Sequence, residues 1–152
     1  MIRLALAMSV CLVGCAPADA PLVSSSDIVA DGIPRALTEA PSDPIRGMQV
    51  FVGRDQGHCV LCHIVSDLDV EFQGNVGPDL TYVADRLTPS QLRLRVVDYQ
   101  IVRPGTLMPS YYRIHDLYQV GREYQDEPVL SAQDIEDVVA YLATLPTKTD
   151  VD

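Results

Sequence analysis

The feature that most constrains this chain is a five-residue motif in which two cysteines, two residues apart, are directly followed by a histidine: Cys59-Val60-Leu61-Cys62-His63. Two thiols at this spacing can reach both vinyl groups of a haem from one helical turn, and the next residue then places an imidazole under the iron. Covalent attachment also retains the cofactor in a domain too small to hold it by burial alone. The motif therefore predicts one covalent haem c per chain, attached at Cys59 and Cys62, with His63 as an iron ligand.

Three other uses of such a cysteine pair fit the sequence less well. A structural zinc site requires four ligands, usually with a second Cys/His pair, whereas the remaining cysteines, Cys11 and Cys15, lie within or at the end of an N-terminal apolar segment. A thioredoxin-like redox pair requires a βαβ context, which the sequence lacks. A disulfide between Cys59 and Cys62 would leave the adjacent His63 unexplained. The haem interpretation accounts for all three side chains.

A haem iron with one histidine ligand needs a partner on its opposite face. Met108 is the only methionine after His63, and it lies in a loop directly before a proline. A thioether there would favour reduced iron and raise its reduction potential, although a lone methionine can also fill a core. His115 and His58 are competitors: His115 is expected at the surface, and His58 adjoins the motif and cannot readily reach the opposite face. Met108 is therefore the predicted second axial ligand.

A Gly-Pro pair at Gly77 and Pro78 follows His63 by fourteen residues. Glycine allows close backbone approach and proline lacks an N–H, so such a turn can lie against the histidine and accept its second ring N–H through a carbonyl. That bond would fix the imidazole and tune the iron. An ordinary loop turn is the alternative interpretation.

Helix signals occur at three places along the chain. Proline follows a candidate cap at Ser42 or Asp43 and another at Thr88, and Ser131 with Asp134 three residues later resembles a capping box. After Ser131, apolar residues recur at helical spacing, which indicates an amphipathic helix that ends before Pro146. No convincing run of alternating residues indicates a strand. The chain is therefore predicted to be all-α, with long loops that a cofactor would help to pack.

Apolar spacing in the first of these helices predicts the face that it buries. Ile45, Met48 and Val52 fall on one face, with Phe51 beside them. Met48 is therefore expected to pack in the core, which leaves Met108 as the methionine available to the iron.

The N-terminus has the features of a targeting segment. Arg3 precedes an apolar run over residues 4–13, which is too short for a permanent membrane span and suits a signal peptide. The run ends in Leu-Val-Gly-Cys, which resembles the lipobox of bacterial lipoproteins. A signal peptide over residues 1–14 and a lipid on Cys15 are therefore predicted. A rival cut after Ala18 fits the small-x-small rule and would leave no lipid anchor.

Composition divides the rest of the chain. Residues 15–42 contain four prolines and a run of three serines, and are predicted to be an N-terminal tether or a loosely wrapped arm. Residues 43–147 are predicted to form the folded domain, and residues 148–152 a short C-terminal tail.

The charge of the chain limits its partners. It carries 11 Lys and Arg against 21 Asp and Glu, a formal net charge of −10, so it is a poor candidate for binding nucleic acid. One window, residues 86–113, is basic, and its arginines could pair with haem propionates, guide a sulfur oxyanion or face a partner. The alternative is that they are scattered and solvated. These arginines are Arg86, Arg93, Arg95, Arg103 and Arg113, opposed within the window by Asp98 alone.

Taken together, these residues resemble class I cytochrome c. The matching features are a glycine and an aromatic residue in the first helix, the haem motif, a Gly-Pro-x-Leu turn, a Met-Pro pair and a Tyr-Leu pair in the final helix. They are Gly47 and Phe51, Cys59 to His63, Gly77 to Leu80, Met108 and Pro109, and Tyr141 and Leu142. The resemblance implies that residues 43–147 form an all-α class I cytochrome c domain with long loops around one covalent haem.

Longer strings narrow the resemblance to SoxX, the mono-haem subunit family of SoxAX complexes. They lie at residues 74–80, 95–98, 106–112 and 130–142, and the resemblance extends over roughly residues 43–146. It implies a periplasmic electron-transfer subunit beside a SoxA-like haem subunit, in a heterodimer or heterotrimer. SoxX is usually soluble, so the predicted lipid anchor on Cys15 departs from the family pattern.

The SoxX resemblance also implies a function. Thiosulfate is oxidatively joined to a cysteine of a carrier protein, as in an L-cysteine S-thiosulfotransferase, and SoxX passes the released electrons to a downstream cytochrome. Catalysis belongs to the thiolate-ligated haem of SoxA, so no catalytic residue carries over to this chain. Two rivals remain: a free-standing periplasmic electron carrier and, less favoured, an open-site haem enzyme.

Overall fold

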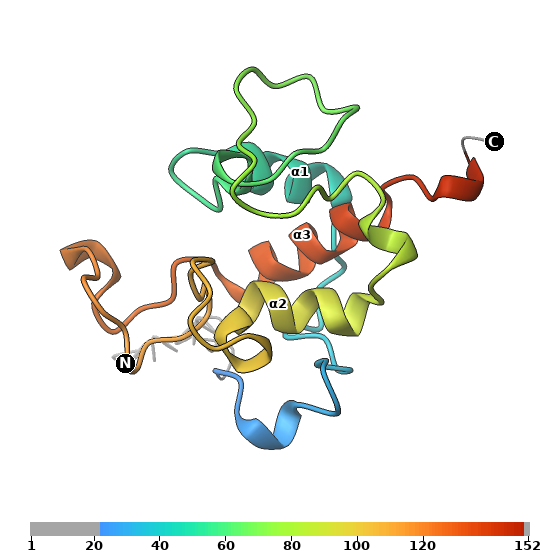
Figure 1. Cartoon of the computed structure of the whole chain (residues 1–152). Helices are drawn as coiled ribbons and strands as arrows, with labels where there is room; N and C mark the ends of the chain where they lie inside the picture. The colour runs from blue at the N-terminus through green and yellow to red at the C-terminus, as the bar shows by residue number, and fades with distance from the viewer. Residues whose placement is uncertain (1–21, 151–152) are drawn as a thin grey trace, which may run out of the picture.

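The computed structural model of this chain describes residues 22–150. Three α-helices, α1 (Pro44–Val52), α2 (Pro89–Val102) and α3 (Ala132–Ala143), are joined by long segments of irregular chain (Figure 1). Short 3₁₀ turns lie at Ser25–Asp27, Cys59–Leu61, Val83–Asp85, Arg122–Tyr124 and Lys148–Asp150. Over residues 22–150 the only β-type pairing is an isolated bridge between Val29 and Gly32. The all-α prediction is confirmed.

The predicted signal peptide over residues 1–14, the candidate lipidation site Cys15 and the rival cut after Ala18 all lie outside the described residues. In the described part of the chain, no helix combines the length and apolar character needed to cross a membrane.

The three helices begin where their caps were predicted. The Asp43 side chain accepts from two amides in the first turn of α1. Reciprocal capping boxes start the other two helices: Thr88 with Gln91 at α2, and Ser131 with Asp134 at α3. Because caps satisfy the amides that a helix leaves free at its start, these residues fix the entry point of each helix.

The buried face of α1 differs from the predicted one. Ile45 is 67% exposed, whereas Gly47, Val50 and Phe51 are buried. Gly47 lies directly against the backbone carbonyl of Asp137 in α3, where a Cβ atom would collide. The closest approach between the two helices is therefore made by a residue with no side chain, and a pattern of apolar residues does not register it. Met48, predicted to pack in the core, is partly buried against it.

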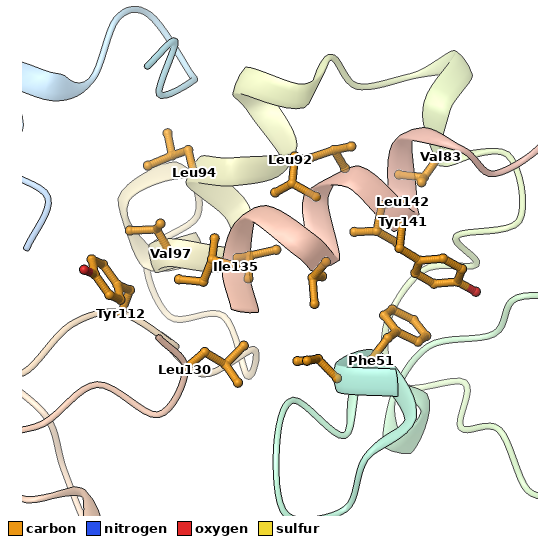
Figure 2. Packing of buried hydrophobic residues seen from close by; sticks show 14 of the residues in the cluster. Phe51, Val83, Leu92, Leu94, Val97, Tyr112, Leu130, Ile135, Tyr141 and Leu142 are labelled. Carbon is orange, nitrogen blue, oxygen red and sulfur yellow. The ribbon is translucent and has the colours of Figure 1, made fainter. Parts of the chain in front are cut away.

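The core lies on both sides of α3, between α1 and α2 (Figure 2). Ile135, Val138 and Leu142 of α3 are at most 4% exposed. Rings of Phe51 and Tyr141 meet edge-on across the α1–α3 contact, with centroids 5.4 Å apart. This packing fixes α1, and therefore the chain that leaves its C-terminal end.

Residues 22–42 form an arm that packs along α2 and α3 (Figure 1). Ile33 is 1% exposed, and its amide donates to the Ser90 carbonyl at 2.9 Å. The Leu37 amide donates to Glu136 Oε1 at 2.9 Å, and Arg93 donates both to the Ile33 carbonyl and to Glu136. A buried ion pair between α2 and α3 thus also anchors the arm.

Candidate haem-binding site

The cysteine motif lies on a single tight turn after α1. The amides of Cys62 and His63 both donate to the Cys59 carbonyl, at 3.1 and 3.0 Å. His58, directly before the turn, has the left-handed conformation (φ 44°), which reverses the chain after α1. Both cysteines are free thiols. The turn therefore gathers two thiols and an imidazole from five consecutive residues, and the disulfide interpretation does not describe this structure.

His63 is held by the Gly-Pro turn. Its Nδ1 lies 2.8 Å from the Pro78 carbonyl oxygen, and the Gly77 amide donates to the Cys62 carbonyl at 2.8 Å. A Cβ atom on Gly77 would collide with the His63 ring. A carbonyl oxygen can only accept, so Nδ1 carries the proton and Nε2 keeps the lone pair of the neutral ring. The imidazole is therefore oriented and set in the tautomer that a metal ligand at Nε2 requires.

Gln73 closes the loop between the motif and this turn. Its side-chain oxygen accepts from the Val65 amide at 2.7 Å, and its side-chain nitrogen donates to the carbonyls of Val65 and Leu68 at 3.1 and 3.0 Å. Sequence reasoning missed Gln73, because a single amide side chain in a polar loop carries no pattern.

Met108 lies between α2 and α3, in residues 103–131, which form the Met108 segment. It is partly buried, and its amide donates to Thr106 Oγ1 at 3.2 Å. The segment approaches the motif through Tyr111, whose hydroxyl donates to the Gly57 carbonyl at 2.8 Å. Tyr111 also hydrogen-bonds with the Cys59 thiol. The structure thus joins the Met108 segment to the motif at the Cys59 end.

The surroundings of Cys59 are apolar. Burial raises the pKa of the Cys59 thiol to about 12. Burial also raises the pKa of Tyr111, and the nearby thiols of Cys59 and Cys62 add to the effect. Both groups are therefore uncharged at neutral pH, in an environment that suits an uncharged thioether and a porphyrin edge.

The two competing histidines, His58 and His115, have different surroundings. His58 precedes the turn and takes no part in the His63–Pro78 pairing. His115 is exposed and lines, with Arg113 and the N-terminal arm, a cavity of about 370 Å³. The structure places His115 beside the arm, not among the residues around His63.

Three of the five arginines of the basic window form ion pairs within the chain, so the alternative interpretation of scattered, solvated arginines does not describe these three. Its arginines pair with acids that sequence distance concealed: Arg93 with Glu136 at 2.6 Å, Arg95 with Asp31 at 3.2 Å and Arg113 with Asp98 at 3.0 Å. Arg86 donates to a backbone carbonyl, that of Asp79, at 2.6 Å. These four side chains therefore have structural partners of their own.

The residues present fit a covalent haem. Two free thiols, a histidine with a free Nε2 and a glycine that leaves room beside the ring supply the donor set that attachment requires. Over residues 22–150, no group of three or more His, Cys, Asp or Glu side chains could hold a metal ion by itself. The cysteine–histidine turn is therefore suited to a prosthetic group that brings its own metal.

Comparison with known proteins adds three findings. Residues 45–146 match the family model described as cytochrome c. The chain is similar to a chain of the crystal structure of SoxXA from P. pantotrophus, with 34% sequence identity, a TM-score of 0.72 and coverage of 82% of this chain and 98% of that one. It is also similar to the c-type cytochrome SorU from Sinorhizobium meliloti, at 22% identity and a TM-score of 0.44, covering 67% of this chain and 88% of that one. No curated protein matches the chain.

Proposed function

This chain belongs to the cytochrome c family, and from that premise we propose that it is the SoxX-type, mono-haem subunit of a SoxAX complex. The chain is a c-type electron carrier with a covalent haem c. One observation supports the finer assignment: the 34% identity with a chain of SoxXA extends over 98% of that chain. In such a complex this subunit accepts the electrons released when thiosulfate is oxidatively joined to a carrier-protein cysteine, and passes them to a downstream cytochrome.

Each site residue has a distinct task in this proposal. Cys59 and Cys62 would hold the haem by thioether bonds, and His63 Nε2 and Met108 Sδ would bind the iron. When bound, haem c supplies a one-electron Fe(III)/Fe(II) couple. The Pro78 carbonyl keeps the proton on Nδ1 of His63, which presents Nε2 with its lone pair. The other ligand comes from a loop that Tyr111 ties to the motif.

With two protein ligands, the iron would have no open position for a substrate. This chain therefore contributes electron transfer, and thiosulfate chemistry belongs to the SoxA-like partner subunit, in a heterodimer or heterotrimer. The proposed location is the periplasm, because haem is attached to such motifs outside the cytoplasm. Anchoring through a lipid on Cys15 is a separate proposal, and the intact mass of the mature N-terminus tests it.

The optical spectrum tests the ligand assignment. Oxidised wild-type protein is expected to show the sulfur–iron charge-transfer band at about 700 nm that accompanies His/Met ligation. Met108→Ala should abolish that band while the haem stays attached. Met48→Leu is the matched control, because Met48 packs against the core, and it should leave the band in place. Absence of the band from the wild type would refute Met108 as a ligand.

Purification of the full chain from its own host, in mild detergent, tests the subunit assignment. A C-terminal affinity tag should recover a second haem-bearing chain in a fixed molar ratio. With thiosulfate and a carrier protein that supplies the acceptor cysteine, the pair should catalyse reduction of an added cytochrome c. Recovery of this chain alone would leave the cytochrome intact and would favour a free-standing electron carrier.

A further inference from the structure

We propose that Asp98 is a positioning residue for the second iron ligand: its buried carboxylate holds the Met108 segment closed over the haem site. The inference rests on the proposed function, because it requires Met108 to be a ligand. It goes further by naming a residue that touches neither haem nor substrate and yet sets how firmly the ligand is held.

The first support is a break in α2. Asp98 has φ −161° and ψ 92°, an extended conformation inside a helix that otherwise runs from Pro89 to Val102. Helical hydrogen bonds are interrupted there, and two α2 carbonyls accept from the Met108 segment instead. The Tyr111 amide donates to Val96 O at 3.4 Å, and the Tyr112 amide to Val97 O at 3.2 Å. Because of the break, α2 provides two backbone acceptors for the chain that follows Met108.

The second support is the set of donors around the carboxylate. Asp98 is 3% exposed. Its Oδ1 accepts from Ser110 Oγ at 2.6 Å and from the Gln100 amide at 3.1 Å, and its Oδ2 accepts from Arg113 Nη1 at 3.0 Å. Ser110 and Arg113 follow Met108 by two and five residues. A single side chain therefore maintains the break in α2 and binds the Met108 segment.

An uncharged side chain at position 98 would hold the Met108 segment less firmly than the carboxylate does. Hydrogen bonds from a hydroxyl and a guanidinium to a carboxylate are stronger than bonds to a neutral acceptor, and removing the carboxylate leaves Arg113 without its ion-pair partner in a largely buried position. The segment on the other side of Met108 contains Pro104 and Gly105 and lies mostly at the surface. The bonds to Asp98 therefore carry much of the closure.

Displacement of the methionine by an added ligand measures the closure directly. An external ligand binds in proportion to the fraction of molecules with an open ligand position. Titration of the oxidised holoprotein with imidazole, followed through the loss of the band at about 700 nm, gives an apparent affinity. Asp98→Ala should tighten imidazole binding about tenfold. Asp98→Asn and Ser110→Ala, which remove fewer bonds, should tighten it less.

Glu136→Gln is the matched control. Glu136 forms the other buried ion pair of α2, with Arg93, but it faces the N-terminal arm. Loss of either pair should lower the unfolding temperature, so stability does not separate the two roles. Of the variants at Asp98, Ser110 and Glu136, only those at Asp98 and Ser110 should change imidazole binding. Equal tightening in Glu136→Gln, or wild-type affinity in Asp98→Asn and Ser110→Ala, would overturn the proposal.

Failure of the underlying ligand assignment has a different signature. If the wild type itself lacks the band at about 700 nm, Met108 is not a ligand and the positioning role falls with it. If Asp98→Ala does not fold, the single hydroxyl removed in Ser110→Ala still decides the question, because its bond to Asp98 is the shortest of the three.

Discussion

The chain around His63 is held mainly by its own backbone, whereas the chain around Met108 is held by side chains that converge on Asp98. On the His63 side, amides of Gly74 and Gly77 donate to carbonyls of Val60 and Cys62, both at 2.8 Å. Glycines at these positions allow the two stretches of backbone to lie in contact. On the Met108 side, the closure depends on the side chains of Asp98, Ser110 and Arg113. Backbone bonds add to it: the Tyr111 and Tyr112 amides donate to α2 carbonyls at 3.4 and 3.2 Å, and the Leu130 amide donates to the Tyr111 carbonyl at 3.1 Å.

This difference gives the two proposed iron ligands, His63 and Met108, supports of unequal stability. Backbone-to-backbone bonds in a tight turn are lost only when the chain itself opens, so His63 is expected to stay in place through small fluctuations. Bonds made by side chains can break one at a time, so the Met108 segment belongs to the less stable part of the molecule. We therefore expect iron–methionine bonding to respond to mutation, heat and added ligands before iron–histidine bonding does.

A valine at position 77 should disturb the chain around His63, and we expect this substitution to have the largest effect. The new side chain would displace the His63 ring and its bond to the Pro78 carbonyl, a steric conflict that costs about 3 kcal/mol. We expect Gly77→Val to lower both the yield of covalent haem and the free energy of unfolding. Haem per chain, measured as the pyridine haemochrome, checks the first, and denaturant unfolding the second. Asn75→Ala, an exposed position in the same loop, should behave as wild type; equal loss there would refute the steric explanation.

What could be predicted from the sequence follows the same division. The motif, the Gly-Pro turn and the caps at Asp43, Thr88 and Ser131 depend on residues close together in the chain, and their geometry follows from local rules. The close contact between Gly77 and the His63 ring could also be predicted, because glycine and proline have few conformational roles.

The remaining features depend on partners distant in sequence. Asp98 was counted as one acid opposing a basic window, whereas it organises the Met108 segment. The sequence presents Arg93 as one arginine of the basic window, but it is buried against Glu136. Gln73 showed no pattern at all. A buried ion pair or a lone amide contributes no periodicity, so only tertiary structure identifies it.

Acid should protonate a buried carboxylate that supports the chain around His63. Asp137 of α3 is 1% exposed and accepts from the Asp43 amide at 2.7 Å and from Arg46 Nε at 2.8 Å, which fixes the start of α1. Burial alone would raise the pKa of Asp137, but bonds from Arg46, Asp43 and Gln133 outweigh it and hold the pKa below 3.8. Because the folded pKa is lowered, the stability that this carboxylate contributes is present above pH 3.8 and is lost as the pH falls through the folded value.

Asp137→Asn should therefore cost about 2 kcal/mol at neutral pH, and this deficit should shrink below pH 3.8, where wild-type Asp137 also becomes protonated. The charged groups that face Asp137 are Arg46 and, through it, Asp43 and Asp134. Denaturant unfolding of both proteins from neutral pH to pH 3 checks the trend, with exposed Asp69→Asn as the control. The band at about 700 nm should persist in the folded variant; its loss at neutral pH would contradict the separation of the two sides.

The smallest expected effect concerns the bond that joins the two sides. The Tyr111 hydroxyl donates to the Gly57 carbonyl at 2.8 Å, so Tyr111→Phe should cost about 1 kcal/mol in the free energy of unfolding. If this bond helps to hold the Met108 segment against the motif, the variant should also tighten imidazole binding, by less than Asp98→Ala does. Combining the two substitutions then gives a double-mutant cycle. Additive changes in imidazole affinity would mean that Asp98 and Tyr111 hold the segment independently. A combined change smaller than the sum would mean that the two interactions are energetically coupled. Wild-type affinity in Tyr111→Phe would mean that the Tyr111 hydroxyl does not hold the Met108 segment closed.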